Sequence, residues 1–415
     1  MEAPLNYLQR YVLRRIGERP GTMMFNLAKM FRLRRGIDLS RLAEALATSA
    51  RSHLALKSVL HRDPDGGVVQ LCGLDDDEIQ VEIVRVSERN LLARRDSYVK
   101  PFDLYDEGLL DAIIFDCGEN SYLLSNIHHL VCDGYSFPII LEDAHRVWNG
   151  ETLEPDRYYE ILARRAARSQ MPVAVAARKF MLELVRSRSF VQLPVPDRHA
   201  ASAYGAREFP IGIPDGFDAR LASARVTRHH FFLSAAVLAL ARLTGCGDVF
   251  IDWVFHGRVT KEELRTVGAF MVDLPMVMSD VGTLTPDEIL YAAKHFTFTG
   301  IKNAHAIKEG DDDELCGCER LTFIYQDQWS ELMSPGLVRP NGPFAWMIEE
   351  TIPLRPTAIA AENPFNVEIM ERADRTVLFL EYDAGRYSPE LVAAYADCFH
   401  SSIATLLEAR QLMPA

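Results

Sequence analysis

The densest cluster of reactive side chains in this chain is the run of residues 127–134, which reads Ile-His-His-Leu-Val-Cys-Asp-Gly. Histidine titrates near neutral pH, so its imidazole is well suited to remove a proton from an attacking amine or hydroxyl. Adjacent side chains on a strand point to opposite faces, so only one of His128 and His129 can face a given cavity. Asp133 can fix a neighbouring group, and Gly134 leaves room for the extended arm of a ligand. The run therefore predicts a histidine base where a strand ends.

Two other interpretations of this run stay open. Adjacent histidines are also found as hydrogen-bonded core side chains, although the full spacing His-His-x-x-x-Asp-Gly is much rarer by chance. Cys132, inside the run, offers a nucleophilic thiol, but such a thiol needs a neighbouring base and a lowered pKa. A buried cysteine otherwise behaves as a small hydrophobic residue, and we favour that interpretation of Cys132.

Two strands and a helix are predicted to position the run. Residues 109–115 and 121–127 read as strands, and the turn-forming residues between them predict a hairpin. A helix is predicted from about residue 136 to residue 148, where Asn149-Gly150 ends it. A strand that ends in a loop before a helix can hold a reactive side chain rigidly and still expose it.

The rest of the chain predicts two α/β halves of similar size. Four prolines fall between Phe190 and Phe217, so residues 1–190 and 217–415 are predicted domains and residues 191–216 a linker. Further helices and strands are predicted at residues 39–52 (capped by Asp38), 158–190 (with a break near Pro172), 227–243, 249–255, 364–370, 376–382 and 389–407.

The composition is that of a globular protein, with 415 residues, 48% hydrophobic and 25% charged. The net charge of −13 disfavours nucleic acid and anionic membranes as partners. Neither a membrane-spanning stretch nor a secretory segment is visible, so we predict a cytoplasmic protein with reduced cysteines. Cys316 and Cys318 are the only close pair among the seven cysteines. They lack a second pair at zinc-finger spacing, so no metal site is predicted.

The His-His-x-x-x-Asp-Gly spacing resembles the active-site motif of nonribosomal peptide synthetase condensation domains, in the chloramphenicol acetyltransferase-like superfamily of CoA-dependent acyltransferases. The resemblance extends along nearly the whole chain, in the family's order. It covers Pro4-Leu5 and Gln9, residues 38–56, Pro101-Phe102-Asp103-Leu104, Phe255-His256-Gly257-Arg258, Val267-Gly268-Ala269-Phe270, Phe323-Ile324-Tyr325-Gln326 and Pro364-Phe365-Asn366-Val367. Asp111, Asp252 and Val272 depart from it, since the family often has Arg, a small Gly and Asn at these positions.

The resemblance implies an α/β fold of two chloramphenicol-acetyltransferase-like halves in a V-shaped pseudo-dimer with a central tunnel. The half formed by residues 1–190 carries the motif, and His129 lies at the middle of the tunnel. No adenylation or thiolation module fits in 415 residues, so we expect a free-standing, monomeric condensation-type protein.

The implied activity is transfer of an acyl or aminoacyl group from a carrier-protein thioester to an amine, in nonribosomal peptide or related natural-product biosynthesis. The donor is carried on the phosphopantetheine of an acyl or peptidyl carrier protein, or on CoA, and no permanently bound cofactor is implied. His129 is the predicted base. His128, Asp133 and Gly134 are expected to shape the active-site loop, and Arg258 to pair with Asp133.

Asp252, Trp253 and His256 are the predicted tunnel residues. Asp252 and Trp253 should face opposite sides of their strand, and an Asp in the tunnel could pair with a cationic substrate. A solvated strand position is the alternative for Asp252, and a packing or solvent-facing position the alternative for His256.

Basic side chains gather in residues 158–190, within an acidic protein. Arg164, Arg165 and Arg168 are therefore the predicted docking residues for an acidic carrier protein. A solvated helix face is the alternative.

Short motifs separate the related functions. Epimerisation domains have Glu two residues before their His-Gly-Arg, where this chain has Val254. The Asp-rich motif of heterocyclisation domains and the Asp-Phe-Gly-Trp-Gly motif of plant alcohol acyltransferases are absent from the sequence. An ester-forming or CoA-dependent acyltransferase stays open, as does a non-catalytic module that binds a carrier protein.

Overall fold

The computed structural model of the chain divides into two compact units. The first unit comprises Met1–Ala167, His256–Met271 and Gln328–Ala358, and the second comprises Arg168–Phe255, Val272–Asp327 and Ile359–Ala415. The residues that the structure describes are 2–18, 21–63, 65–105, 107–186, 190, 193, 202–306, 321–326, 332, 336–355, 363–372 and 374–409.

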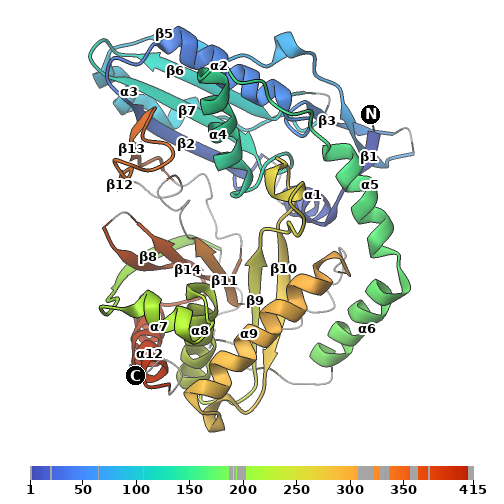
Figure 1. The fold of residues 1–415 in the computed structure, drawn as a ribbon, viewed down its shortest axis with the longest axis vertical. Coiled ribbons are helices and arrows are strands. Elements are labelled where there is room, and N and C mark those ends of the chain that lie inside the picture. The colour runs from blue at the N-terminus through green and yellow to red at the C-terminus, as the bar shows by residue number, and fades with distance from the viewer. Residues whose placement is uncertain are drawn as a thin grey trace. The chain divides into compact units, whose positions relative to one another are not determined.

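A six-stranded sheet forms the centre of the first unit, in the order β12-β13-β2-β7-β6-β5 (Figure 1). Neighbouring strands are antiparallel except β5 and β6, which are parallel. The strands are β2 (Asn26–Leu33), β5 (Glu82–Arg85), β6 (Leu110–Asp116), β7 (Ser121–His128), β12 (Gly336–Leu337) and β13 (Ile348–Ile352). A smaller sheet has the order β1-β4-β3 and consists of β1 (Glu2–Pro4), β3 (Ser58–Arg62) and β4 (Val68–Cys72).

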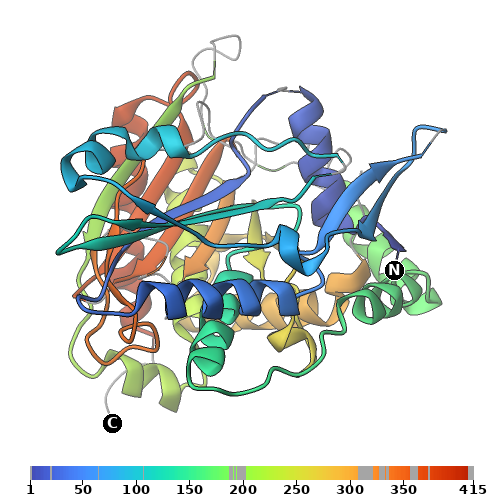
Figure 2. The same cartoon turned by 90° about the horizontal axis from the view of Figure 1, so that it is seen from above.

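Helices α2 (Leu39–Ser52) and α4 (Ser136–Trp148) pack together on one face of the six-stranded sheet (Figure 2). Helix α2 begins after Asp38, whose carboxylate accepts a hydrogen bond from the Arg41 N–H at 3.0 Å. The apolar stripe that predicts this helix is buried in the core of the unit. The other α-helices described in the unit are α1 (Tyr7–Glu18), α3 (Glu88–Arg94) and α5 (Tyr158–Ser169).

The second unit has its own six-stranded sheet, in the order β10-β9-β11-β14-β15-β8. Strand β11 is parallel to both of its neighbours, and the other pairs are antiparallel. The strands are β8 (Tyr204–Ile211), β9 (Val249–Phe255), β10 (Val272–Met278), β11 (Leu321–Gln326), β14 (Phe365–Glu371) and β15 (Thr376–Asp383).

Helices α8 (Arg228–Thr244), α9 (Pro286–Asn303) and α12 (Pro389–Leu407) cover one face of this sheet. Helix α8 is buried without interruption from His230 to Ala241, which explains why its sequence is apolar on all sides. Helices α6 (Pro172–Arg186) and α7 (Phe217–Ser223) belong to the same unit.

The predicted helices and strands are confirmed with small shifts. Helices α2, α4 and α12 and strand β9 have the predicted bounds, β7 and β15 extend one residue further, and β6, α8 and β14 are shifted by one residue at both ends. The long helical stretch breaks where predicted, because α5 ends at Ser169 and α6 begins at Pro172. Proline is favourable in a first helical turn, where its missing N–H leaves no hydrogen bond broken.

The prediction of a linker over residues 191–216 is wrong for part of that range. Residues 204–211 form β8, which pairs with β15 over its full length. Pro210 is tolerated there because β8 is the edge strand of its sheet. Residues 191–192 and 194–201 lie outside the described residues.

Two segments from the second half of the sequence belong to the first unit. Residues 256–271 connect β9 to β10, and Gln328–Ala358 supply β12 and β13. The predicted α/β fold is confirmed, whereas the V-shaped pairing of the halves and the central tunnel stay predictions. No described helix is long and apolar enough to cross a membrane.

Candidate active site

The histidine pair stands at the end of strand β7. The strand ends at His128, which lies opposite Asn26 of β2 in the antiparallel register. The chain then turns: the His129 N–H donates to the Phe25 carbonyl at 2.8 Å, and the Val131 N–H donates to the His128 carbonyl at 3.1 Å. The turn gives the two imidazoles different surroundings.

His128 is a core side chain, with only 2% of its surface exposed. Its Nδ1 accepts a hydrogen bond from the Leu130 N–H at 3.2 Å, and its ring meets Phe102 edge-on at 5.9 Å. Burial lowers the pKa of His128 to about 3, so the ring is neutral at neutral pH. These contacts fit the structural role predicted for it.

His129 is half-buried, and its Nδ1 has no hydrogen-bond partner among the described residues. Burial lowers the pKa of His129, while the charge of Asp133 opposes the shift. A neutral imidazole with an unpaired nitrogen is the form that can accept a proton. His129 thus differs from His128, whose Nδ1 accepts a hydrogen bond from the Leu130 N–H.

The predicted ion pair between Asp133 and Arg258 is present and fully buried. It is bidentate, with Nη1 to Oδ2 at 2.8 Å and Nη2 to Oδ1 at 3.1 Å. Both residues belong to the first unit, because Arg258 lies on residues 256–271, which we call the latch segment. Burial alone would raise the pKa of Asp133, but Arg258 and further hydrogen bonds hold it below its usual value.

Ser136 completes this network at the start of α4. Its N–H and its hydroxyl donate to Asp133 Oδ1 at 2.9 and 2.8 Å. Its Oγ accepts from Arg258 Nη2 at 2.7 Å and from the Gly268 N–H at 2.9 Å. The Phe270 N–H donates to Asp133 Oδ2 at 2.9 Å. The loop that follows His129 is thus bound to the latch segment through every polar atom of the Asp133 carboxylate.

Gly257 lets the latch segment fold back on itself. Its φ is +73°, and a Cβ at this position would lie 1.8 Å from the Phe270 carbonyl oxygen. Any other residue would force the two ends of the latch segment apart. Beside it, His256 is half-buried and stacks on Tyr135 at 4.6 Å, and its Nδ1 accepts from the Arg258 N–H at 3.2 Å.

A second hydrogen-bond network, which starts from Gln9 of α1, holds the loop that follows His129. Gln9 Nε2 donates to the Leu130 carbonyl at 2.8 Å, one residue after His129. Gln9 also bonds Gln70, which accepts from the Tyr158 hydroxyl at 2.8 Å. The sequence analysis missed the roles of Gln9 and Ser136, although Gln9 lies in the opening segment that resembles condensation domains.

The sequence of this chain matches a family model over residues 1–294, and the family's description is Condensation domain. The chain belongs to the condensation-domain family. It is 22% identical over 311 residues to surfactin synthase subunit 2 of Bacillus subtilis (strain 168), covering 72% of this chain and 9% of that protein. The chain spans only about a tenth of the length of the first curated relatives that it matches.

Solved structures show the same fold for this condensation domain. The condensation domain of the monacolin K polyketide synthase MokA matches 100% of this chain and 98% of that chain, with a TM-score of 0.81 and 17% identity. The epimerization domain of tyrocidine synthetase B, TycB3(E), matches 98% of each chain, with a TM-score of 0.73 and 18% identity. At these identities the likeness establishes the fold alone.

The three predicted docking arginines of this condensation domain differ in accessibility. Arg165 points inward: its Nε donates to Glu263 at 3.0 Å, its Nη2 donates to the Gly257 carbonyl, and its guanidinium lies 4.3 Å from the Phe270 ring. It supports the latch segment and offers little surface to a partner. Arg164 and Arg168 are exposed, although Arg164 pairs with Glu262 at 2.6 Å.

The two predicted tunnel residues on β9 face opposite sides of the second unit's sheet. Trp253 lies against α8 and α9: its ring is 5.1 Å from that of His229, and a Cβ added at Gly300 would lie 3.1 Å from it. Asp252 points to the face without these helices. Both side chains are 2% exposed, so the alternative of a solvated strand position is wrong for Asp252.

Cys132 is fully buried, and burial raises the pKa of its thiol well above the usual value. A neutral thiol is a poor nucleophile, which supports the interpretation of Cys132 as a packing residue. Gly134 is half-buried in the turn before α4. Cys316 and Cys318 lie outside the described residues.

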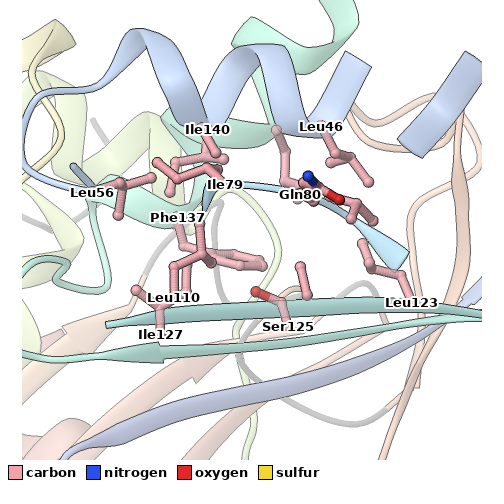
Figure 3. Close-up of a pocket in the computed structure, with 14 residues that line it drawn as sticks. Leu46, Leu56, Ile79, Gln80, Leu110, Leu123, Ser125, Ile127, Phe137 and Ile140 are labelled. Carbon is pink, nitrogen blue, oxygen red and sulfur yellow. The ribbon is translucent and has the colours of Figure 1, made fainter. Parts of the chain in front are cut away.

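An apolar pocket lies between α2, α4 and the β6–β7 hairpin (Figure 3). It holds about 450 Å³ of space not filled by atoms, part of it open to solvent. Its lining includes Leu110 and Ile127 on the strands and Leu46, Phe137 and Ile140 on the helices. The pocket thus lies beside β7, the strand that ends at His128.

Proposed function

We propose that this condensation domain transfers an acyl group from a carrier-protein thioester to an amine, with His129 as general base. The observation that carries the proposal is that His129 Nδ1 has no partner among the described residues, on a loop whose neighbouring Asp133 is completely hydrogen-bonded. Such an arrangement fixes the backbone and leaves one proton acceptor available. Membership of the condensation-domain family supports acyl transfer as the reaction.

The chemistry follows from these groups. The nitrogen of the acceptor amine attacks the thioester carbonyl carbon, and a C–N bond forms as the C–S bond breaks. His129 takes the proton that the amine loses, and the phosphopantetheine sulfur leaves as a thiol with an equivalent proton. A positioned base contributes ~10²–10⁴-fold to such a step, and holding the two substrates together contributes the remainder. No covalent acyl-enzyme is required, in keeping with a protonated and buried Cys132.

The identity of the donor is best tested by supplying one acyl group as three different thioesters. The full chain is given the acyl group on holo carrier protein, on CoA and on N-acetylcysteamine, with an amine or an alcohol as acceptor, and products are identified by mass spectrometry. We expect an amide, formed fastest from the carrier-bound donor.

Each other outcome assigns a different function. An ester as the only product would identify an ester-forming enzyme. Equal use of acyl-CoA, with no gain from the carrier protein, would identify a CoA-dependent acyltransferase. Binding of acyl-carrier protein with no product from any donor would identify a non-catalytic module.

A further inference from the structure

The apolar pocket of the first unit owes its space to small side chains on the sheet. Ala112 of β6 pairs with Ser125 of β7, and the pairs before and after it on the same face consist of larger aliphatic residues. Ala50 of α2 also lines the pocket. Because the larger pairs hold the helices away from the sheet, the small pair leaves a gap in a core that is otherwise close-packed.

The pocket is elongated along β7. Leu123, Ser125 and Ile127 are alternate residues of this strand, and all three line the pocket (Figure 3). Four residues of an antiparallel strand extend for about 14 Å, so the lining continues over that length. The space of about 450 Å³ lies within the usual range for small-ligand sites, roughly 300–1,000 Å³. A long, narrow space fits an unbranched chain.

The mouth of the pocket lies beside β6, where β5 has not yet begun. Strand β5 pairs with β6 only from Ile113 onward. Leu110 and Ala112 come before that point, and both are half-buried. Gln80 is exposed at the same side, whereas the lining residues on the helices and on β7 are buried. A ligand can therefore enter between residues 79–81 and β6.

The interior of the pocket is hydrophobic. Gln80 and Ser125 are its only polar lining residues. Gln80 stands at the mouth, and its Nε2 donates to the Asp77 carbonyl at 2.6 Å. Ser125 places its hydroxyl on the floor (Figure 3). Burial of hydrocarbon is therefore the main source of affinity that the pocket offers.

The mouth is flanked by an acidic segment, Asp75-Asp76-Asp77-Glu78, which directly precedes Ile79 and is exposed. Two cations of this region already have carboxylate partners: Lys57 pairs with Asp76 at 2.6 Å and Arg51 with Glu44 at 3.1 Å. A free carboxylate at the mouth would be repelled by this segment. The polar end of a ligand is therefore expected to be uncharged.

We propose that this pocket binds the unbranched aliphatic chain of a ligand whose polar end is uncharged, such as a thioester or an alcohol. The chain has two sources, the acyl group of the donor or a separate amphiphile. Ile127, at one end of the pocket, lies two residues before His129, which makes the donor a source. That source rests on the proposed function, whereas the pocket stands on its own geometry.

Binding of simple alcohols to the full chain tests the pocket directly. 1-Octanol, 1-butanol and octanoate are titrated by calorimetry into the unaltered protein and into Ala112→Leu and Thr48→Leu variants. We expect 1-octanol to bind more tightly than 1-butanol, by about fourfold for each additional methylene that is buried. Octanoate should bind more weakly than 1-octanol. Ala112→Leu fills the gap and should weaken 1-octanol binding at least about tenfold.

Thr48→Leu is the matched control, since Thr48 lies on α2 with Ala50 but does not line the pocket. It should leave 1-octanol binding unchanged. Thermal unfolding of each variant shows whether it is folded, and Ala112→Val, a smaller change, serves if Ala112→Leu unfolds. Failure of 1-octanol to bind the unaltered protein, or equal affinity in the folded Ala112 variant, would overturn the proposal.

Two donors then distinguish the sources of the chain. If the pocket holds the donor's acyl group, the octanoyl thioester of N-acetylcysteamine should have a lower KM than the acetyl thioester. Ala112→Leu should remove that difference, and 1-octanol should compete with the octanoyl donor. Binding of 1-octanol with equal KM values for both donors would assign the pocket to a separate amphiphile.

The same measurements separate the pocket from the proposed function. Binding of 1-octanol that Ala112→Leu weakens, without acyl transfer from any donor, would retain the pocket and reject the proposed function. Acyl transfer without measurable binding of 1-octanol would retain the proposed function and reject the pocket.

Discussion

The carboxylate of Asp133 in the first unit accepts five hydrogen bonds, from Arg258, Ser136 and the Phe270 N–H. In the second unit, the buried Asn366 keeps an unpaired oxygen among the described residues, while its Nδ2 donates to Glu381 Oε1 at 3.2 Å. Both side chains are buried, and every oxygen of the Asp133 carboxylate has a partner within the first unit. The difference shows that the first network is complete without any further group.

This contrast has a physical basis. A buried polar network is stabilising only when its members are satisfied, because the low dielectric of the interior makes each unpaired group costly. The Asp133 network meets that condition with residues that are 125 and 137 positions apart in sequence. It therefore holds the loop after His129 in place before any substrate binds.

Breaking the Asp133–Arg258 pair should have the largest effect on stability. Arg258→Leu leaves a buried carboxylate without its cation, and we expect it to lower the free energy of unfolding by about 3–5 kcal/mol, measured by urea denaturation. Acyl transfer should fall with it. The exposed pair of Arg164 and Glu262 gives the matched control, and Arg164→Gln should cost less than about 1 kcal/mol.

Replacing both partners should then recover part of that loss. An Asp133→Leu, Arg258→Leu double variant removes the stranded charge, so it should be more stable than Arg258→Leu alone. If Arg258→Leu and Arg164→Gln lower the free energy of unfolding equally, the buried pair does not hold the latch segment in place.

Acid should destabilise the protein in two stages. Burial lowers the pKa of His128 to about 3 and that of His53 to about 4, against about 6.5 when unfolded. Below pH 6.5 the unfolded state binds protons that these folded histidines do not, so each removes up to about 1.4 kcal/mol of stability per pH unit. The pKa of Asp133 is lowered too, so its contribution is lost only below about pH 3.9, its unfolded value.

Unfolding measured between pH 8 and pH 4.5 tests the histidine stage. His128→Gln cannot take up a proton, so its stability should fall less steeply than that of the unaltered protein below pH 6.5. If the stability of the variant and that of the unaltered protein fall equally with pH, His128 takes up a proton in the folded state as readily as in the unfolded state.

Substitutions of two arginines in α5 should distinguish a residue that supports the latch segment from one that docks the carrier protein. Arg165→Gln loses the contacts with Glu263 and Phe270, so we expect it to slow transfer from the carrier-bound donor and from the N-acetylcysteamine thioester alike. Arg168→Glu changes an exposed charge, and should slow only the carrier-dependent reaction, severalfold and less so at high salt. Equal slowing of both donors by Arg168→Glu would argue against docking there.

Cys132→Ala should have the smallest effect on turnover. The thiol is buried and protonated, so we expect a rate constant within about twofold of normal and a loss of about 1 kcal/mol in stability from the lost packing. A rate reduced a hundredfold, with the fold retained, would restore the nucleophile interpretation.

Local sequence patterns predicted much of the fold. The apolar stripe behind Asp38 predicts α2, and the turn between residues 115 and 121 predicts the hairpin that leads to His129. These elements depend on neighbours close in sequence. Strand β8 was missed because Pro210 and the prolines on either side of the strand suggest a linker, and only its edge position next to β15 makes Pro210 acceptable.

The candidate site was predicted less completely. Motif resemblance indicated His129, Asp133 and Arg258, but the inward turn of Arg165 depends on where the latch segment lies. The role of Gln9 likewise depends on a contact with Leu130, 121 residues away. Such contacts between distant segments leave no periodic pattern in the sequence.

The most direct test of the account is the single-turnover rate of amide formation by His129→Ala. Saturating acyl-carrier protein and amine are mixed with excess protein, and product is followed by mass spectrometry after rapid quenching. Because His129 Nδ1 has no partner among the described residues, the variant should unfold at nearly the same temperature as the unaltered protein. Its rate constant should be lower by ~10²–10⁴-fold. A near-normal rate constant in the folded variant would show that His129 is not the general base.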